Sequence, residues 1–211
     1  MPATVPDSSP RREFGSLFNN KKYSDLTVYL RDIPLPAHRL ILGMRSPYLE
    51  DQLQPQKCGV IGLRFDEDNP HALWRVFEYI YTGDYADEPA ELLQLLLEDD
   101  DPELFRHLRV YALADAMQME DLKSLSCKKF ELQLKEHWMS DTFVDCIREV
   151  YSTSTGIGTA ATRRVVVETA SLQQNEFVQE PLFQDLVREV GDFAVDLISA
   201  MAKGGGAFRN V

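Results

Sequence analysis

Apolar and polar residues alternate along three short stretches in the first third of the chain. From Asp25 to Leu30, three apolar side chains face one way and the residues between them face the other, which predicts a half-buried β-strand. Ile33–Ala37 predicts a second strand, and its prolines favour an edge position because proline cannot donate to a neighbouring strand. Cys58–Phe65 shows the same alternation and predicts a third strand.

Helices are predicted between and after these strands, and two of them have clear starts. His38–Met44 is an apolar-rich stretch of helical length. Ser46 and Asn69 each precede a proline, which is typical of an N-cap followed by the first helical residue. The first of these capped helices is predicted to run to Leu53. The second has apolar residues three and four positions apart and is predicted to stop at Gly83.

The rest of the chain has helical periodicity only. A helical stripe begins at Leu104 and is interrupted at Met117–Met119. A linker rich in serine, threonine and glycine is predicted at Ser152–Thr159, and a last long helix at Pro181–Met201. Strands gathered early and helices gathered late indicate an α+β fold rather than a doubly wound one.

The charge of the chain excludes some classes of partner. With 22 Lys+Arg against 34 Asp+Glu, the formal net charge is -12, whereas nucleic acid and anionic membranes are bound by a clustered basic face. Nine acidic residues and no Lys or Arg lie between Asp84 and Glu103, so the acidity is concentrated in one insert. A solvated loop is the expected structure of this insert, with attraction of a basic partner segment as the alternative.

No motif in the sequence supports catalysis, a cofactor or a metal. The four histidines lack the spacing of metal ligands, and the three cysteines are far apart, as free thiols of a reducing compartment would be. Asp99–Asp101 lacks the alternation and the central glycine of a calcium loop. Gly156–Ala161 matches G-x-G-x-x-A, but it follows a helical stripe rather than a strand, which favours a linker.

Four blocks of sequence, in order and at the right spacing, resemble the BTB/POZ domain. The resemblance covers Phe14–Phe130, and the acidic insert and helical C-terminal region are similar to those of the short stand-alone BTB proteins of filamentous fungi. The blocks are Tyr23–Val28, Leu35–Leu42 with Arg45–Leu49, Phe77–Tyr85, and Val110–Asp115.

The resemblance implies a small β-sheet flanked by α-helical hairpins, followed by a helical C-terminal extension. The expected domains are a disordered leader at 1–13, a BTB/POZ domain at 14–131 with its acidic insert at 84–103, the extension at 132–202 and a flexible tail at 203–211. No apolar run reaches the roughly 18 residues of a transmembrane helix, and the N-terminus has no apolar signal core, so a cytoplasmic or nuclear location is expected.

The function that the resemblance implies is a non-catalytic scaffold or adaptor that forms homodimers. In many family members an Asp and a basic residue form a charged pocket at the dimer seam, and the matching residues are Asp25 and Arg39. The alternative is that Asp25 caps a strand start and Arg39 is exposed at a helix start. Trp138 stands among polar residues, and it either packs the C-terminal helices or anchors a partner.

Two further roles are implied by the resemblance, each through protein partners. A substrate adaptor of a cullin-RING ubiquitin ligase usually carries a hydrophobic-x-Glu motif, and Gln54–Lys57 has no glutamate. A transcription-associated regulator would need a partner to contact DNA. Six residues of the insert are candidates for binding a basic partner segment: Asp87, Glu88, Glu98, Asp99, Asp100 and Asp101.

Overall fold

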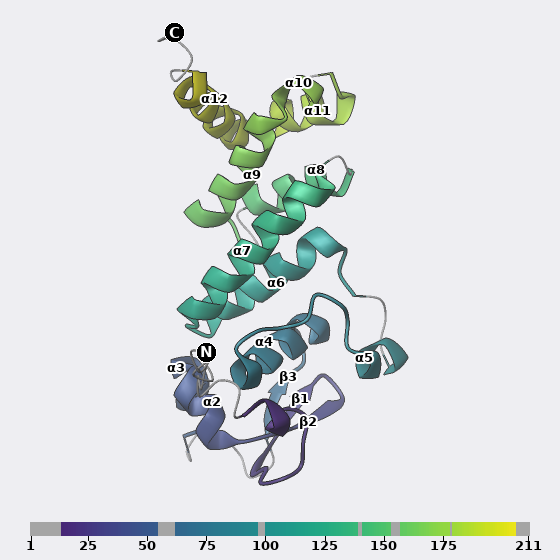
Figure 1. The fold of residues 1–211 in the computed structure, drawn as a ribbon, viewed down its shortest axis with the longest axis vertical. Coiled ribbons are helices and arrows are strands. Elements are labelled where there is room, and N and C mark those ends of the chain that lie inside the picture. Colours follow the sequence, from purple (N-terminus) through teal and green to yellow (C-terminus); the bar gives the residue numbers. More distant parts are fainter. Residues whose placement is uncertain are drawn as a thin grey trace, which may run out of the picture. The chain divides into compact units, whose positions relative to one another are not determined.

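The computed structural model forms two compact units (Figure 1). The sheet unit comprises Met1–Asp101 with Leu113–Lys123, and the helical unit comprises Pro102–Ala112 with Ser124–Val211. The residues that the structure describes are 14–54, 62–96, 100–138, 141–152, 157–177 and 179–205. The predicted leader at 1–13 lies outside the described residues.

The sheet unit contains three short strands in the order β2-β1-β3. β1 (Leu26–Leu30) pairs antiparallel with β2 (Ile33–Ala37) and parallel with β3 (Leu63–Phe65). β2 is an edge strand, as its prolines predicted. The apolar positions of β1 are buried and those between them are partly exposed, so the predicted alternation is confirmed. β3 begins at Leu63, and residues 58–61 of the predicted third strand lie outside the described residues.

The predicted helix starts are confirmed by their caps. Ser46 Oγ accepts a hydrogen bond from the backbone N–H of Leu49, and Asn69 Oδ1 accepts from two N–H groups of the next helix. That helix ends at Gly83, whose φ of 82° is the left-handed conformation that glycine adopts readily. The helical elements of the sheet unit are η1 (Gly15–Leu17), α2 (Arg39–Arg45), α3 (Pro47–Gln52), α4 (Pro70–Thr82) and α5 (Glu91–Leu96).

Two helices carry the chain from one unit into the other. α6 (Glu103–Ala116) and α7 (Glu120–His137) each have residues in both units. They are joined through Gln118, whose positive φ of 57° turns the chain where Met117–Met119 was predicted to interrupt the helical stripe. α7 runs as one continuous helix through residue 131, where the boundary between the BTB/POZ domain and the helical extension was predicted.

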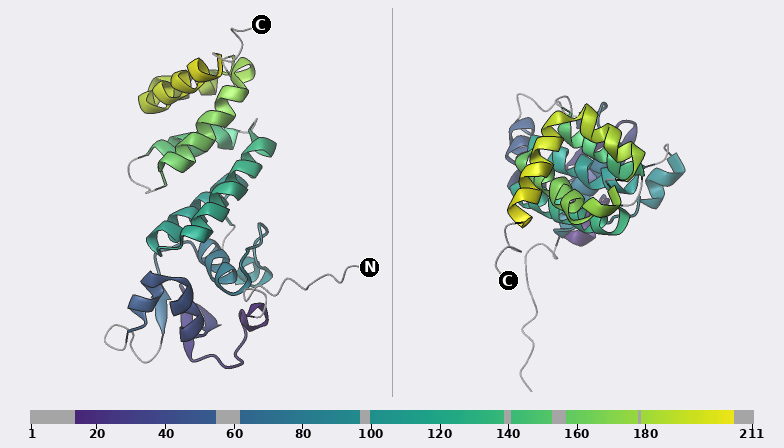
Figure 2. Two further views of the ribbon diagram at one scale, coloured as in Figure 1. Left: turned by 60° about the vertical axis from the view of Figure 1, so that its left-hand side comes forward. Right: turned by 90° about the horizontal axis from the view of Figure 1, so that it is seen from above.

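The helical unit is built around an apolar core with many aromatic rings. Phe143, Phe183 and Phe193 are all buried in it. Figure 2 shows α9 and α12, which pack against each other within this unit. Its further helices are α8 (Asp141–Tyr151), α9 (Ala160–Leu172), α10 (Gln174–Phe177), α11 (Pro181–Glu189) and α12 (Gly191–Gly205).

The last helix predicted from the sequence is two helices. Val190 leaves the helical region, with φ −108° and ψ 79°, and α12 starts at the next residue. The predicted apolar stripe still points into the core, since Leu186, Phe193 and Leu197 are buried. α12 continues to Gly205, so a tail beginning at 203 is wrong, and residues 206–211 lie outside the described residues.

The predicted linker is packed where the structure describes it. Ile157 is buried, and Thr159 forms a capping box at the start of α9. A Cβ atom at Gly158 would lie 2.4 Å from the carbonyl oxygen of Val150, so this glycine is required by a close backbone approach. A flexible linker is therefore wrong for these residues, and 153–156 lie outside the described part of the chain.

Candidate protein-interaction surfaces

The start of α2 is fixed by a buried hydrogen-bond network. His38 Nε2 lies 2.8 Å from the carbonyl oxygen of Lys22, which can only accept, so Nε2 carries the proton. In the tautomer with its proton on Nε2, Nδ1 accepts from the hydroxyl of Tyr81 at 2.9 Å, while the same hydroxyl oxygen accepts from the His38 backbone N–H at 3.0 Å. Burial raises the pKa of Tyr81 to about 12, which keeps the donating proton in place.

A cluster of exposed apolar side chains lies beside this network, here named the α2 face (Tyr23, Leu40 and Met44). Leu40 and Met44 are one helical turn apart and are 74% and 72% exposed. Tyr23 is also exposed and follows Lys22, whose carbonyl group is bound to His38. A groove of about 590 Å³ runs alongside, with Leu40 and Met44 in its lining. Exposed apolar surface such as that of Leu40 and Met44 marks interaction sites.

The two residues of the predicted charged pocket lie close together. The carboxylate Oδ1 of Asp25 accepts a hydrogen bond from the backbone N–H of Arg39 at 2.8 Å. Asp25 therefore stabilises the first turn of α2, where a negative charge is favourable. The Arg39 guanidinium donates to the carbonyl oxygen of Leu53 at 3.4 Å. Asp25 is exposed in the single chain, and the pocket between two copies stays a prediction.

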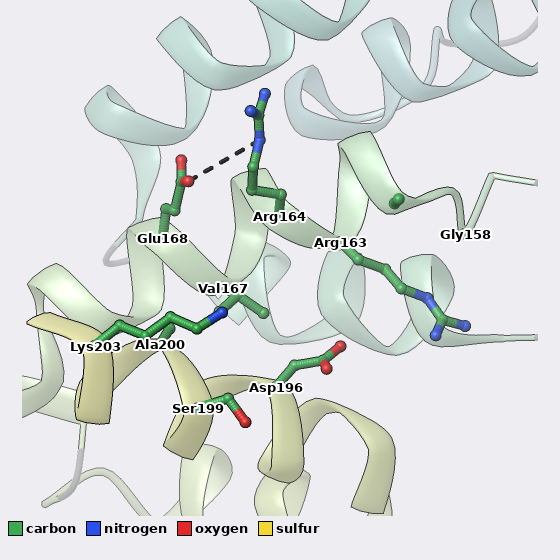
Figure 3. A pocket seen from close by; sticks show the side chains of 10 residues that line it. Gly158, Arg163, Arg164, Val167, Glu168, Asp196, Ser199, Ala200 and Lys203 are labelled. Atoms are coloured by element: carbon green, nitrogen blue, oxygen red, sulfur yellow. Dashed lines mark ion pairs between the residues drawn. The ribbon is translucent and has the colours of Figure 1, made fainter.

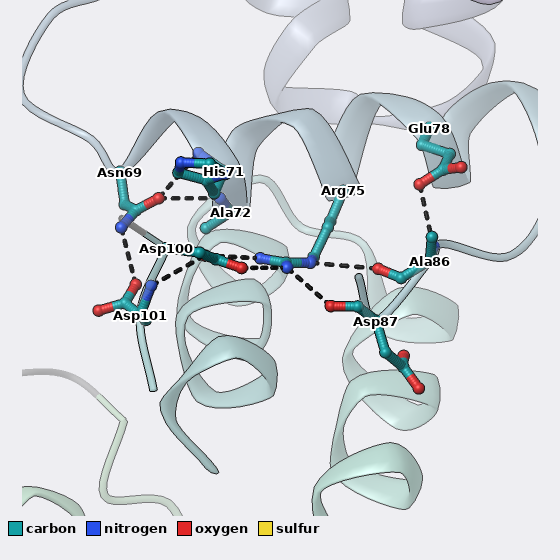
Figure 4. A network of polar contacts seen from close by, with 9 residues as sticks. All are labelled: Asn69, His71, Ala72, Arg75, Glu78, Ala86, Asp87, Asp100 and Asp101. Atoms are coloured by element: carbon teal, nitrogen blue, oxygen red, sulfur yellow. Dashed lines mark hydrogen bonds and ion pairs between the residues drawn. The ribbon is translucent and has the colours of Figure 1, made fainter. Parts of the chain in front are cut away.

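The acidic insert is held by Arg75 of α4 (Figure 4). Arg75 and Asp100 are buried to the same degree, with side chains 3% exposed, and form a bidentate ion pair through both terminal nitrogens. The same guanidinium donates to the backbone carbonyl oxygens of Ala86 at 3.2 Å and Asp87 at 2.9 Å. One cation therefore binds the beginning and the end of the insert.

Two further contacts attach the insert to the sheet unit. Asn69, the N-cap of α4, donates from its side-chain amide to Asp101 Oδ2 at 2.7 Å. Leu93 of α5 is fully buried, and Tyr85 is almost fully buried, which raises the pKa of its hydroxyl. The prediction of a wholly solvated insert is therefore wrong. Burial of its carboxylate is tolerated because a buried carboxylate with a cationic partner costs less than an unpaired one.

The candidate partner-binding residues of the insert divide into two groups. Asp100 and Asp101 make structural contacts, whereas the side chains of Asp87 and Glu88 are exposed. Glu98 and Asp99 lie outside the described residues. Partner binding by the exposed residues stays a prediction. The ion pair of Arg75 with Asp100 is here named the clamp. Sequence reasoning missed it because the two residues are 25 positions apart. An arginine between apolar residues of α4 was nevertheless a usable signal.

The described residues show no grouping that could hold a metal ion. Within the same ranges, no helix has the length and hydropathy that crossing a membrane requires. Cys127 and Cys146 are free thiols, and burial raises the pKa of both. Trp138 packs edge-on against Phe177 with ring centroids 5.4 Å apart, so it contributes to the core of the helical unit.

The exposed apolar and charged surfaces are those of a protein-interaction domain of α+β type, and comparison with known proteins identifies the family. The model of the BTB/POZ domain matches residues 14–134, and the chain belongs to the BTB/POZ domain family. BTB/POZ domains are protein–protein interaction modules, and families of this type are non-enzymatic. The resemblance to the BTB/POZ domain is thus confirmed, together with the α+β BTB/POZ fold and its helical extension, whereas the similarity to the stand-alone BTB proteins of filamentous fungi stays a prediction.

Two relatives illustrate how far the similarity extends. Mouse (Mus musculus) Kelch-like protein 40 is 28% identical over 81 residues, which is 37% of this chain and 13% of that protein. The chain therefore corresponds to a small part of that relative's length. The structure of the BTB (Tramtrack and Bric a brac) domain of human gigaxonin covers 61% of this chain and 95% of that domain, at 20% identity and a TM-score of 0.42.

Proposed function

We propose that the chain is a non-catalytic BTB/POZ scaffold or adaptor that forms homodimers through the α2 face. The observation that carries this proposal is the pair of exposed apolar side chains on α2, Leu40 and Met44, at 74% and 72% exposure. A two-fold symmetric dimer would place the same face of both copies together and remove these side chains from water. Homodimers are common among BTB/POZ domains.

The conformation of Tyr23 supports the same surface. Its φ of 63° lies in the left-handed region, which is uncommon for a bulky side chain and costs of order 1–3 kcal/mol. The ring is nevertheless 77% exposed, so no burial within the single chain compensates for this cost. Contact with a second copy would bury the ring and offset it.

Asp25 and Arg39 are proposed to form the charged pocket at the edge of this interface. In the single chain Asp25 is exposed, and its carboxylate binds the backbone of Arg39. A second copy would reduce the access of water and so strengthen interactions of the carboxylate with nearby donors. Asp25→Ala should then lower the stability of the dimer, and this loss of free energy should exceed the loss of stability of the monomer.

The experiment that tests the proposal is the solution mass of the chain by light scattering, with two matched variants. Leu40→Glu should raise the dimer dissociation constant by about 10–100-fold, because a charge would be placed in an apolar interface. Leu172→Glu, at the end of α9, changes a leucine of similar exposure, 78%, and should leave the dimer intact. A monomeric wild-type chain at micromolar concentration, or equal dimerisation of both variants, would contradict the proposal.

The other implied roles are separated from this one by direct binding experiments. Binding to a purified cullin N-terminal domain would favour the ubiquitin-ligase adaptor, although Gln54–Lys57 lacks the expected glutamate and, apart from Gln54, lies outside the described residues. A transcription-associated role would require a partner protein that binds DNA. A cytoplasmic or nuclear location is proposed for all of these roles and is tested by microscopy of the tagged chain.

A further inference from the structure

The helical unit contains a groove between α9 and α12, here named the α9–α12 groove. Its volume is about 670 Å³, within the range of roughly 300–1,000 Å³ that is usual for ligand pockets. Figure 3 shows the side chains that line it, which come from both helices. Three of them are cationic: Arg163, Arg164 and Lys203. Such a cluster is unexpected in a chain with a formal net charge of -12.

The carboxylates of the groove leave part of this positive charge uncompensated. Glu168 lies 4.0 Å from Arg164, a distance at the limit of an ion pair. The Asp196 carboxylate accepts a hydrogen bond from the hydroxyl of Tyr151 at 2.7 Å. No hydrogen bond or ion pair links Lys203 to any other residue within the described ranges. The groove therefore contains one cation more than the two carboxylates balance.

Arg163 supplies donors that have no acceptor. Its guanidinium lies over the ring of Tyr151, with the central carbon 4.6 Å from the ring centroid, which holds the group in place. Its Nε is buried and has no hydrogen-bond partner among the residues that the structure describes. A buried donor without a partner is unfavourable, and an arriving acceptor would recover part of this cost.

Two apolar side chains of α12 are exposed beside the groove. Val195 and Ile198 are 62% and 66% exposed, and Ser199, which lines the groove, is adjacent to Ile198 in the chain. The opposite face of the same helix is buried through Phe193 and Leu197. A surface helix normally has polar residues on its outward face, so this exposed apolar strip indicates a second contact.

We propose that the α9–α12 groove binds an acidic peptide segment of a partner protein. Carboxylates of the segment would occupy the groove beside Arg163 and Lys203, and an apolar side chain would cover Val195 and Ile198. Carboxylates suit this site because a guanidinium can donate two parallel hydrogen bonds to one carboxylate. Nucleic acid requires an extended basic face, whereas this groove offers a local cluster of three cations. The proposal concerns a different surface from the α2 face and does not depend on dimerisation.

The test is selection of short random peptides displayed on phage against the full chain, followed by fluorescence anisotropy with one selected peptide. The selected peptides should be enriched in Asp and Glu together with an apolar residue. Lys203→Gln and Arg163→Gln should each weaken binding about tenfold, because each removes a charge-assisted contact. Lys203 is exposed, so its variant is informative even if Arg163→Gln disturbs the packing against Tyr151.

Three controls make the outcome decisive. Arg188→Gln changes an exposed arginine of α11 outside the groove and should leave peptide binding within about twofold of the wild type. Leu40→Glu should also leave it unchanged, which distinguishes this proposal from the dimer. Peptides without acidic enrichment, or equal binding by Lys203→Gln, Arg163→Gln and the wild type, would overturn the proposal. Displacement of the peptide by inorganic phosphate at equal concentration would also overturn it and indicate a small-anion site.

Discussion

The two units of the chain differ in how deeply their ion pairs are buried, since the side chains of Arg75 and Asp100 in the sheet unit are 3% exposed, whereas those of Arg109 and Glu149 in the helical unit are 32% and 17% exposed. In the sheet unit, polar side chains join residues far apart in sequence, as in Arg75 with Asp100 and His38 with Tyr81. In the helical unit, aromatic rings pack on one another, and Phe177 and Phe183 stack with centroids 4.7 Å apart. Polar contacts have strict geometry, whereas apolar packing tolerates changes of shape. The sheet unit should therefore be sensitive to changes of single atoms and of pH.

The largest effect is expected from breaking the clamp of the acidic insert. Asp100→Ala leaves the Arg75 guanidinium buried without its carboxylate, which should lower the free energy of unfolding by about 3–5 kcal/mol. Urea denaturation of the full chain measures this change. The double variant Arg75→Met, Asp100→Leu should recover much of the loss, because it removes both charges and retains apolar volume.

Arg64→Ala is the matched control for the clamp. Arg64 also pairs with a carboxylate, Asp66, at 3.1 Å, but its side chain is 51% exposed, so its loss should cost much less than the loss of Asp100. If Asp100→Ala were as mild as Arg64→Ala, the insert would be dispensable, as its composition suggested. The buried ion pair would then contribute no more to the free energy of unfolding than the exposed one.

An intermediate effect is expected in the helical unit. Trp138→Ala removes the ring that packs against Phe177 and should cost about 2–3 kcal/mol, less than the 3–5 kcal/mol typical of a fully buried aromatic, because Trp138 is only partly buried. Trp138→Phe should recover most of this loss, which would confirm that packing volume is what matters. A neutral Trp138→Ala variant would show instead that the ring serves a partner.

The sequence predicted those features that depend on local pattern. The helix starts at Ser46 and Asn69 and the stop at Gly83 follow from cap and turn chemistry over a few residues, and all three are observed. The apolar alternation of Leu26–Leu30 likewise determines which face of β1 is buried. Such signals are read within one element, so they do not require knowledge of the tertiary structure.

The features that the sequence did not predict depend on tertiary contacts. A count of carboxylates could not show that Asp100 meets Arg75 or that Leu93 of the insert is buried. The break at Val190 was also missed, because the apolar periodicity continues through it into α12. The α9–α12 groove brings together residues from two helices that are separated by α10 and α11, and no spacing within either helix indicates it.

The smallest and most specific effect is expected at Tyr81. Tyr81→Phe leaves Nδ1 and the backbone N–H of His38 without their hydroxyl partner and should cost about 1–2 kcal/mol at neutral pH. The wild type should also lose stability in alkali. Its unfolded chain ionises near the usual pKa of about 10, whereas burial raises the folded pKa to about 12, so the stabilisation is complete below pH 10 and is lost between these values.

Urea midpoints measured from pH 8 to pH 12 isolate this contribution. The difference in stability between the wild type and Tyr81→Phe should shrink as the pH rises through this window, because the variant has no phenol to ionise at this position. Tyr48→Phe, at a half-buried tyrosine of α3, provides the control for the chemical change itself. A constant difference between the wild type and Tyr81→Phe would contradict the raised pKa of Tyr81 in the folded chain. It would also remove the expectation that the sheet unit responds to pH through its buried polar contacts.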